Sequence, residues 1–260
     1  MIPKTIHYCW FGRNPKPKLA LKCIKSWKKK CPDYEIIEWN EDNFDISKAP
    51  LYVRQAYEAK KWAFVTDYVR LWAMVNFGGI YMDTDVEVKK TLDGFLKHRA
   101  FSGFEDEVNI PTGIMACEKN FPLFGEFLNY YDDASFYDSN GNITYVTNVD
   151  IITDICVKKG LLRNNTLQNI EGFVLYPKDV FCPVSYHTLK LERTKETVTI
   201  HWFAGSWKTE AQRNAHKNYT DEIKRRDRID TFVHMPNRIV KRILGEAKYN
   251  EMKEKLKRKS

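Results

Sequence analysis

The chain has 260 residues and a mass of 30.7 kDa, and its 43% hydrophobic and 29% charged residues are enough for a sizeable core, which excludes a disordered chain. No stretch approaches the roughly 18 uninterrupted apolar residues of a membrane-spanning helix. The net charge of +8 is uneven: residues 208–260 hold 16 of the 42 basic and 8 of the 34 acidic residues, so residues 1–207 are neutral, which argues against a nucleic-acid-binding body.

The first 90 residues alternate strand and helix patterns. Apolar and polar side chains alternate from Ile6 to Trp10 as in a buried strand, and the helix and strand that follow complete a βαβ opening. A Gly78-Gly79 pair ends the second helical region, which is read as one or two helices. Strands are predicted at residues 2–10, 34–39, 80–82 and 86–88, and helices at 19–30 and 52–77.

The later elements carry weaker signals. Strands are predicted at residues 100–104, 112–116 and 197–203, and helices at 121–131 and 150–159. The alternation favours an α/β fold with a mostly parallel sheet and helices on both faces, in which ligands bind at the carboxyl ends of the strands. No Pro/Gly/Ser-rich linker divides the run, so we expect one catalytic domain, 1–208, followed by a basic helical extension, 209–260.

Cysteine usage and the start of the chain indicate a compartment. Six cysteines are scattered without a CxxC pair, which favours a reducing environment over a zinc knuckle or a disulfide framework. The opening Met1–Lys4 lacks the layout of a signal peptide. We therefore expect a cytoplasmic protein, and the basic extension adds the hypothesis of peripheral contact with the inner face of the membrane.

The strongest local feature is the Asp83-Thr84-Asp85 triplet after a short apolar strand. In extended chain, side chains at i and i+2 point to the same side, so both carboxylates can face one point. Paired hard anions suit Mg²⁺ or Mn²⁺. Taken alone the triplet is more typical of a solvated turn, and its position after a strand is what favours a metal site.

Two further groups of residues could carry chemistry. Asp67 and Arg70 are three apart on a predicted helix and share a face, so they could bind sugar hydroxyls or diphosphate oxygens, or form a structural ion pair. The block from His201 to Trp207 offers an imidazole for a metal, a Ser206 hydroxyl for a phosphate and an indole that could close over a ligand, with core packing as the alternative.

The order of four motifs resembles glycosyltransferase family 32, which includes capsular and exopolysaccharide transferases, relatives of yeast mannosyltransferases and distant kin among clostridial glucosylating toxins. The motifs are IPKTIHYCWFG (2–12), WAFVTDYVR (62–70), GGIYMDTD (78–85) and HWFAGSW (201–207). The resemblance covers roughly residues 1–208. It implies a GT-A fold, a nucleotide-diphosphate-sugar donor with a UDP-sugar favoured, a divalent cation and retention of anomeric configuration.

The resemblance also implies a role for each matching residue. Asp83 and Asp85 would hold the metal, with Asp83 also on the donor's ribose or sugar side, and His201 would approach the metal or diphosphate. The remaining residues would contact the donor: Asp67 and Arg70 its sugar hydroxyls and phosphate, Tyr81 its nucleotide, His7 to Trp10 its base, and Ser206 with Trp207 its β-phosphate. Asn148 and Asp150 are candidates for a polar group under the anomeric carbon.

A nucleotide diphosphate leaves readily only when its developing charge is neutralised, which a cation and a nearby Arg can do. A same-face route and a covalent double displacement both give retention, and residue types leave the two open. A metal-dependent phosphohydrolase and a nucleic-acid-binding protein that uses the basic tail are the alternatives. A phosphohydrolase usually needs more ligands, because it holds two metals. A nucleic-acid-binding protein would have aromatic and basic residues interleaved on a strand platform, and this sequence shows none.

The acceptor is expected to be a saccharide or a lipid-linked saccharide of surface polysaccharide synthesis. Residues 229–260 have helix-like apolar spacing among many Lys and Arg residues. The hypothesis is that this segment rests on anionic membrane, where a lipid-linked acceptor would lie. A solvated helical face is the alternative.

Overall fold

The computed structural model describes residues 1–144, 146–205, 214, 218–223, 225, 244–245 and 248–251. The chain divides into two units, Met1–Trp207 and Lys208–Ser260. The helical extension predicted for 209–260 lies largely outside the described residues and stays a prediction. Among the described residues, no helix has both the length and the apolar character that a membrane crossing requires.

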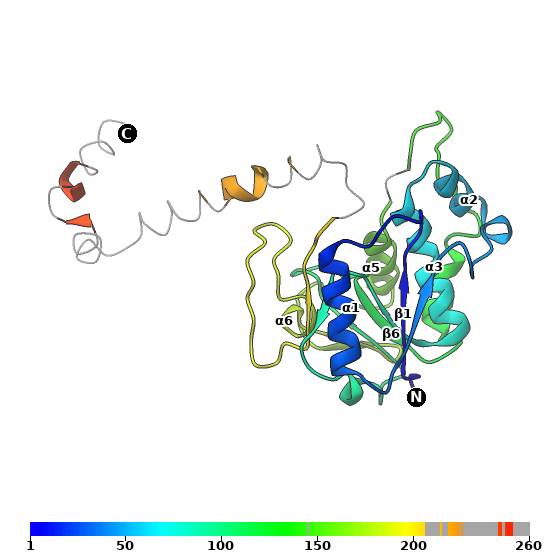
Figure 1. Ribbon diagram of the computed structural model, residues 1–260, viewed down its shortest axis with the longest axis horizontal. Helices are drawn as coiled ribbons and strands as arrows, with labels where there is room; N and C mark the ends of the chain where they lie inside the picture. The colour runs from blue at the N-terminus through cyan, green and yellow to red at the C-terminus, as the bar shows by residue number, and fades with distance from the viewer. Residues whose placement is uncertain are drawn as a thin grey trace. The chain divides into compact units, whose positions relative to one another are not determined.

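A sheet forms the centre of the first unit (Figure 1). It has seven strands, in the order β2-β1-β3-β6-β5-β8-β7. Its strands are β1 (Thr5–Cys9), β2 (Glu35–Trp39), β3 (Gly79–Met82), β5 (Ala100–Gly103), β6 (Ile114–Cys117), β7 (Gln168–Ile170) and β8 (Phe173–Tyr176). Only β6 and β7 run against the other strands of this sheet. The prediction of a mostly parallel sheet is therefore confirmed.

The chain changes direction across the sheet at β1. Helix α1 (Lys18–Lys30) leads from β1 to β2 on one side, whereas α2 (Leu51–Glu58) and α3 (Trp62–Phe77) lead back to β3 on the other side. In open α/β sheets, such a reversal leaves a crevice outside the carboxyl ends of the two strands, where ligands bind. The carboxyl ends of β1 and β3 are therefore where a ligand is expected.

Helices cover both faces of the sheet, as predicted. On β3, Ile80 and Met82 belong to one apolar core and Tyr81 belongs to the other, which follows from the alternation of side chains along a strand. The first core includes residues of α1 and of α6 (Lys178–Phe181), and the second includes residues of α2, α3, α4 (Pro122–Asn129) and α5 (Asn148–Lys158). Two short 3-10 helices, Ile46–Lys48 and Asp93–Phe95, complete the helical elements of residues 1–144 and 146–205.

A separate two-stranded antiparallel ribbon of β4 (Val86–Val88) and β9 (Thr199–His201) positions the site. It pairs Val86 with His201. Trp27 of α1 is fully buried and its Nε1 donates to the Val86 carbonyl at 2.7 Å, which fixes the ribbon against the body. Loss of such a buried Trp side chain costs about 3–5 kcal/mol.

Several predicted elements differ from the observed ones. The region predicted as one or two helices is two, with Lys60 at φ 56° between them. Strands β7 and β8 and helix α6 were not predicted. The three-residue edge strand beginning Gln168-Asn169 and the four-residue helix carry too little apolar periodicity, whereas the apolar run FVLY of β8 is a strand signal that the prediction missed. The predicted helix at 150–159 begins instead at Asn148.

Candidate active site

Asp83 and Asp85 lie on a turn between β3 and β4. The Val86 N–H donates to the Asp83 carbonyl at 3.0 Å, and the Asp83 N–H donates to the Gly113 carbonyl at 2.8 Å. The expectation that extended chain would align the two carboxylates is therefore wrong in its mechanism. The turn brings them together instead, because β4 leaves the main sheet to pair with β9.

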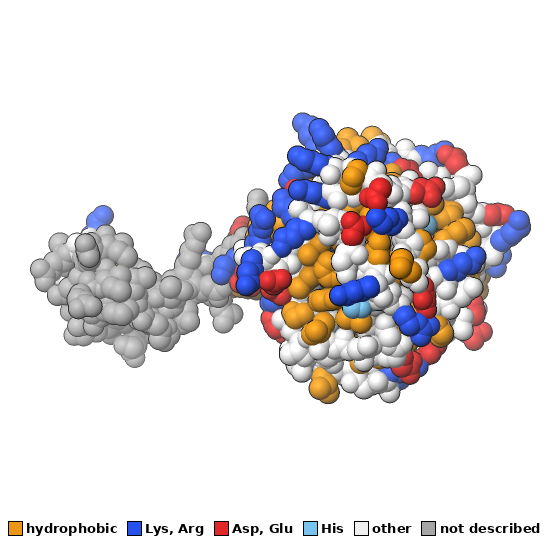
Figure 2. All heavy atoms as spheres, turned by 90° about the horizontal axis from the view of Figure 1, so that it is seen from below, with side chains coloured by type: hydrophobic (Ala, Val, Ile, Leu, Met, Phe, Trp, Pro, Cys, Tyr) orange, Lys and Arg blue, Asp and Glu red, His pale blue; other side chains and the backbone are white. Residues whose placement is uncertain are grey.

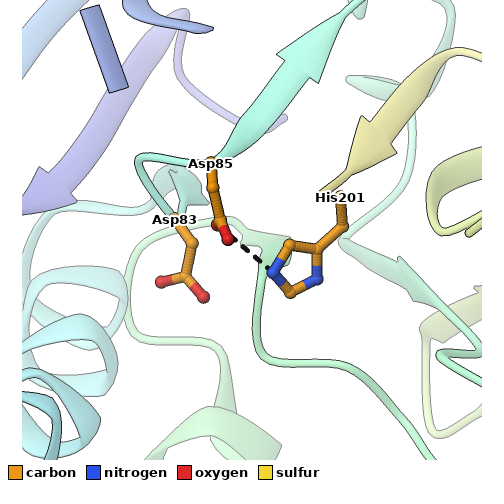
Figure 3. Close-up of side chains that lie close together, drawn as sticks. All are labelled: Asp83, Asp85 and His201. Carbon is orange, nitrogen blue, oxygen red and sulfur yellow. Dashed lines mark ion pairs between the residues drawn. The ribbon is translucent and has the colours of Figure 1, made fainter. Parts of the chain in front are cut away.

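His201 joins these two carboxylates across 116 residues of sequence. Its place at the end of β9, opposite Val86, brings its Nε2 to 3.3 Å from Oδ1 of Asp85. One ligand atom from each of Asp83, Asp85 and His201 lies within 4.8 Å of the others (Figure 3). All three side chains are more than two-thirds buried, with 27%, 17% and 10% of their surfaces exposed.

The Asp85–His201 pair has a strong electrostatic coupling. Burial by itself lowers the pKa of His201, but the charge of Asp85 and its hydrogen bond outweigh burial, so the pKa lies well above the usual value. Burial would raise the pKa of Asp85, yet the charge of His201 holds it below the usual value. The Ala204 N–H also donates to Oδ2 of Asp85 at 2.8 Å. Without a cation, the two side chains therefore form an ion pair.

Arg70 links the helical motif to the acidic turn. It is 5% exposed, and its Nη2 lies 3.2 Å from Oδ1 of Asp67 and 3.6 Å from Oδ1 of Asp83. Its Nη1 donates to the Thr112 carbonyl at 2.7 Å. Burial raises the pKa of Asp67 to about 6, against the opposing charge of Arg70. The predicted shared face of Asp67 and Arg70 is confirmed, and both residues adjoin the metal candidates.

Tyr81 lies beneath Asp83 in the core. Its side chain is 1% exposed, its hydroxyl donates to Oδ1 of Asp83 at 2.8 Å, and the Arg70 guanidinium carbon lies 4.8 Å from its ring centroid. This burial contradicts the predicted direct contact of Tyr81 with the nucleotide. Its hydroxyl instead orients a carboxylate that belongs to the candidate metal site.

Gly113, which the sequence did not single out, is required by the position of His201. A Cβ at Gly113 would lie 2.7 Å from two atoms of the imidazole ring, closer than real Cβ contacts. The loop between β5 and β6 therefore packs its backbone directly against the metal candidate. A close backbone approach of this kind is a common reason for a glycine beside a site.

The structure corrects the roles of Asn148 and Asp150. Asn148 is 1% exposed, with its Nδ2 donating to the Asp67 carbonyl at 2.8 Å and its Oδ1 accepting from the Tyr131 hydroxyl at 2.8 Å. Asp150 forms a capping box with Thr147 at the start of α5. The first holds the Asp67 backbone and the second caps a helix, so neither is free to contact a reacting carbon.

His7 is also corrected. It is fully buried, its Nδ1 accepts from Trp39 Nε1 at 3.1 Å, and its Nε2 donates to the Gly78 carbonyl at 3.0 Å. Burial lowers its pKa to about 4, so the ring is neutral and has no free nitrogen for a nucleotide. Trp10 is half-buried at the end of β1 and remains a candidate contact for the base. Ser206 and Trp207 lie outside the described residues.

Glu105 is a titratable side chain near the site that the sequence did not indicate. It follows β5 by two residues, and burial raises its pKa to about 7, with the charges of His201, Asp106, Asp83 and Arg70 acting on it. The signal was present, because a carboxylate directly after a strand is the same pattern that singled out Asp83.

The donor set fits one divalent cation. Two carboxylates and one imidazole give three ligands of the kinds that hard and intermediate divalent ions accept, and a three-ligand set leaves positions for phosphate oxygens. Asp83, Asp85 and His201 would hold the ion. The sequence prediction of these three side chains as one group is thereby supported by their geometry.

One stretch of the chain matches a known protein family. Residues 17–102 match the family model described as a glycosyltransferase sugar-binding region containing a DXD motif. The matched range includes Asp67, Arg70, Asp83 and Asp85, and it is narrower than the predicted resemblance over 1–208. Residues 17–102 therefore carry a sugar-binding region of the DXD glycosyltransferase kind, in agreement with the resemblance predicted from the motifs in this range.

Two yeast proteins are similar to this chain over part of their length. Over 126 residues the chain is 30% identical to inositol phosphoceramide mannosyltransferase 3 of Schizosaccharomyces pombe, which covers 47% of this chain and 35% of the relative. Over 198 residues it is 25% identical to mannosyl phosphorylinositol ceramide synthase CSH1 of Saccharomyces cerevisiae, and the match covers 69% of this chain and 48% of the relative. The chain thus spans half or less of the length of these relatives.

Two solved structures show weaker likeness. The PaToxG glycosyltransferase aligns with a TM-score of 0.48 and 22% identity, over 61% of this chain and 70% of that one. The galactosyltransferase LgtC, in complex with donor and acceptor sugar analogs, aligns with a TM-score of 0.41 and 14% identity, over 84% and 94%. With TM-scores below 0.5, these two likenesses carry no argument about the chain.

Proposed function

We propose that the chain transfers a sugar from a nucleotide-diphosphate donor to a hydroxyl of a saccharide or lipid-linked saccharide acceptor. One observation carries the proposal: ligand atoms of Asp83, Asp85 and His201 lie within 4.8 Å of one another just after the carboxyl end of β3, where the strand order predicts a ligand. Mn²⁺ suits this set better than Mg²⁺, because Mg²⁺ prefers oxygen ligands and one of the three ligands is an imidazole. A UDP-sugar donor stays the prediction from the sequence resemblance.

A bound divalent cation supplies positive charge that neutralises the diphosphate as the sugar leaves. Arg70 adds a fixed positive charge beside Asp83, held in place by Asp67 and by the Thr112 carbonyl. Because these donors are set before the substrate arrives, little reorganisation is needed as charge develops. Retention of configuration is proposed from the sequence resemblance, by either of its two routes.

The names of the yeast relatives favour a mannose donor as a second candidate and a lipid-bearing acceptor. Both are named for mannose transfer or for a mannosyl product that contains ceramide. A screen of UDP-sugars and mannose donors therefore decides between two concrete alternatives. A surface polysaccharide as the final product remains a proposal drawn from the resemblance.

A cytoplasmic location with peripheral membrane contact through the basic extension is also proposed. Its support is the charge of residues 208–260, with 16 basic and 8 acidic residues. Helix α1 offers a second basic surface, with six lysines and no acidic residue, so a test of membrane binding needs a control on this helix. Figure 2 shows Lys and Arg side chains gathered along one border of the visible face.

Vesicle flotation tests the membrane proposal in the full chain. We expect Lys253→Glu combined with Lys255→Glu to weaken binding to anionic vesicles, and Lys25→Glu combined with Lys28→Glu on α1 to leave it unchanged. Equal binding by all three proteins to anionic vesicles would remove the proposal.

The enzymatic proposal is tested by a donor-hydrolysis screen with Mn²⁺, in which even slow release of free nucleotide identifies the donor. We expect Asp85→Asn to lower metal-dependent release about 100-fold or more, because a metal ligand is lost. Asp42→Asn is the matched control, since Asp42 is exposed and pairs only with Arg13 among the described residues. Full activity of Asp85→Asn, or release of phosphate in place of sugar, would contradict the proposal.

A further inference from the structure

Glu105 has a carboxyl group that no contact within the fold explains. Its side chain is half-buried, and within residues 1–144 and 146–205 it makes no side-chain hydrogen bond and no ion pair. Burying an unpaired charge costs free energy. Among the described residues, the carboxyl group therefore has no structural partner, and a partly buried carboxyl of this kind is a candidate for contact with a ligand.

The start of the β5–β6 loop is built to hold Glu105 in place. The Glu105 N–H donates to the Asn109 carbonyl at 2.8 Å, and the Asp106 carboxylate accepts from the N–H groups of Val108 and Asn109, both at 2.8 Å. These bonds close a tight turn directly after β5. The side chain thus leaves a fixed backbone and not a loose loop tip.

The other end of the same loop contacts the active site. Arg70 donates to the Thr112 carbonyl at 2.7 Å, the Asp83 N–H donates to the Gly113 carbonyl at 2.8 Å, and Gly113 packs against His201. Because β5 and β6 are neighbours, both ends of the loop lie at the same edge of the sheet. The charges of His201, Asp83 and Arg70 accordingly act on the Glu105 carboxyl.

The order of strands gives Glu105 a place along the donor. The crevice between β1 and β3 is where the nucleotide is expected, and the metal candidates follow β3. β5 lies two strands beyond β3, which is about 10 Å at the usual strand spacing. A donor that begins at β1 and has its diphosphate at the end of β3 would extend its sugar towards the end of β5.

We propose that Glu105 accepts hydrogen bonds from hydroxyls of the sugar that is transferred. The inference rests on the proposed function and adds a residue that binds the sugar and not the nucleotide. A carboxyl group has two oxygens that accept hydrogen bonds from neighbouring hydroxyls, and charge-assisted bonds of this kind are the stronger ones. The ligand class is a hexose with free hydroxyls on the face turned to β5.

The test compares affinity for the nucleotide with affinity for the nucleotide sugar in the full chain. Calorimetric titration with Mn²⁺ uses UDP, UDP-glucose, UDP-galactose, GDP and GDP-mannose as probes. For the donor that wild type hydrolyses, we expect Glu105→Gln to weaken binding of the nucleotide sugar about tenfold and to leave the free nucleotide within about twofold. Glu107→Gln is the matched control, because Glu107 lies on the same loop, is exposed and pairs with Lys178.

The outcomes distinguish failure of the proposed function from failure of the role proposed for Glu105. If wild type binds none of the nucleotides with Mn²⁺, the proposed function fails. If wild type binds them and Glu105→Gln binds the nucleotide sugar as wild type does, or loses the free nucleotide equally, only the role of Glu105 is overturned. Thermal unfolding without ligand guards against misfolding: we expect Glu105→Gln to melt at or above the wild-type temperature, and a lower melting temperature would show a structural role.

Discussion

Nε2 of His201 lies 3.3 Å from Oδ1 of Asp85, so an ion pair occupies the point where we propose that a cation binds. The charge of Asp85, working against burial, raises the pKa of His201 well above its usual value. A nitrogen that carries a proton cannot ligate a metal, so the cation and a proton compete for the same imidazole.

Because of this competition, the affinity for Mn²⁺ should increase with pH. Below the pKa of His201, the imidazole is protonated, so Mn²⁺ must displace a proton and its affinity should rise about tenfold per pH unit as pH increases. Calorimetry in buffers of different ionisation enthalpy, between about pH 6 and pH 8, should detect close to one proton released per Mn²⁺ bound. Binding without proton release would show that His201 is not a ligand.

Gly113→Ala tests whether packing against the Gly113 backbone fixes the position of the His201 imidazole. The added Cβ would lie 2.7 Å from the His201 ring, so the ring or the loop must move. We expect a loss of about 1–3 kcal/mol in the free energy of unfolding and Mn²⁺ affinity reduced about tenfold or more. Urea denaturation and Mn²⁺ titration measure the two effects.

The matched control is Gly125→Ala on α4, where an added Cβ meets no atom within 4 Å. Alanine is the better helix former, so this variant should gain up to about 1 kcal/mol and bind Mn²⁺ as wild type does. Equal Mn²⁺ affinity in both glycine variants would argue against the packing of His201 on Gly113.

Asn148→Ala and Asp150→Asn test whether these two residues stabilise the fold or take part in the reaction. Asn148→Ala leaves the Tyr131 hydroxyl and the Asp67 carbonyl without their partner, so we expect a loss of about 2–4 kcal/mol in the free energy of unfolding. Asp150→Asn weakens a capping box and should cost about 1 kcal/mol. Turnover per folded molecule should stay near wild type for Asp150→Asn, and a hundredfold loss there would restore its catalytic assignment.

Local patterns made half of this site predictable. Asp67 and Arg70 are three apart, so helix geometry indicates that they share a face. Asp83 and Asp85 are two apart and do come together, but through the turn between β3 and β4 and not through the extended geometry that predicted it. The contact between the two pairs, from Arg70 to Asp83, depends on the packing of α3 against β3. The fold class followed from the alternation of elements, whereas β7 and α6 were too short to leave a pattern.

The site residues that come from distant parts of the sequence were predicted from the family resemblance alone or were not predicted. His201 reaches Asp85 through the pairing of β4 with β9, and no periodicity in either strand specifies that partner. Asn148 looked reactive in the sequence because its residue type is polar. Its two hydrogen bonds are formed with segments distant in sequence, and these decide that it is structural.

Glu105 gives a stability dependence on pH in the metal-free protein. Its pKa is raised from 4.5 to about 7, so the stability that its protonated form contributes is present below pH 4.5 and lost as pH rises through about 7. The groups whose charges act on it are His201, Asp106, Asp83 and Arg70.

Glu105→Gln removes this titration. With discounting for partial exposure, we expect its stability relative to wild type to increase by about 1–3 kcal/mol between pH 4.5 and pH 8. Urea denaturation at several pH values measures the difference, and Glu107→Gln should show no such trend. A constant difference across this range would mean that the fold does not perturb Glu105.

The central claim is that Asp83, Asp85 and His201 hold the cation that carries the donor diphosphate. Anomalous diffraction at the manganese edge, from a crystal grown with Mn²⁺ and UDP, tests it most directly. We expect one manganese peak with protein ligands from these three side chains at about 2.0–2.6 Å and with diphosphate oxygens completing its coordination. A manganese peak elsewhere, or UDP bound with no manganese at this turn, would contradict it.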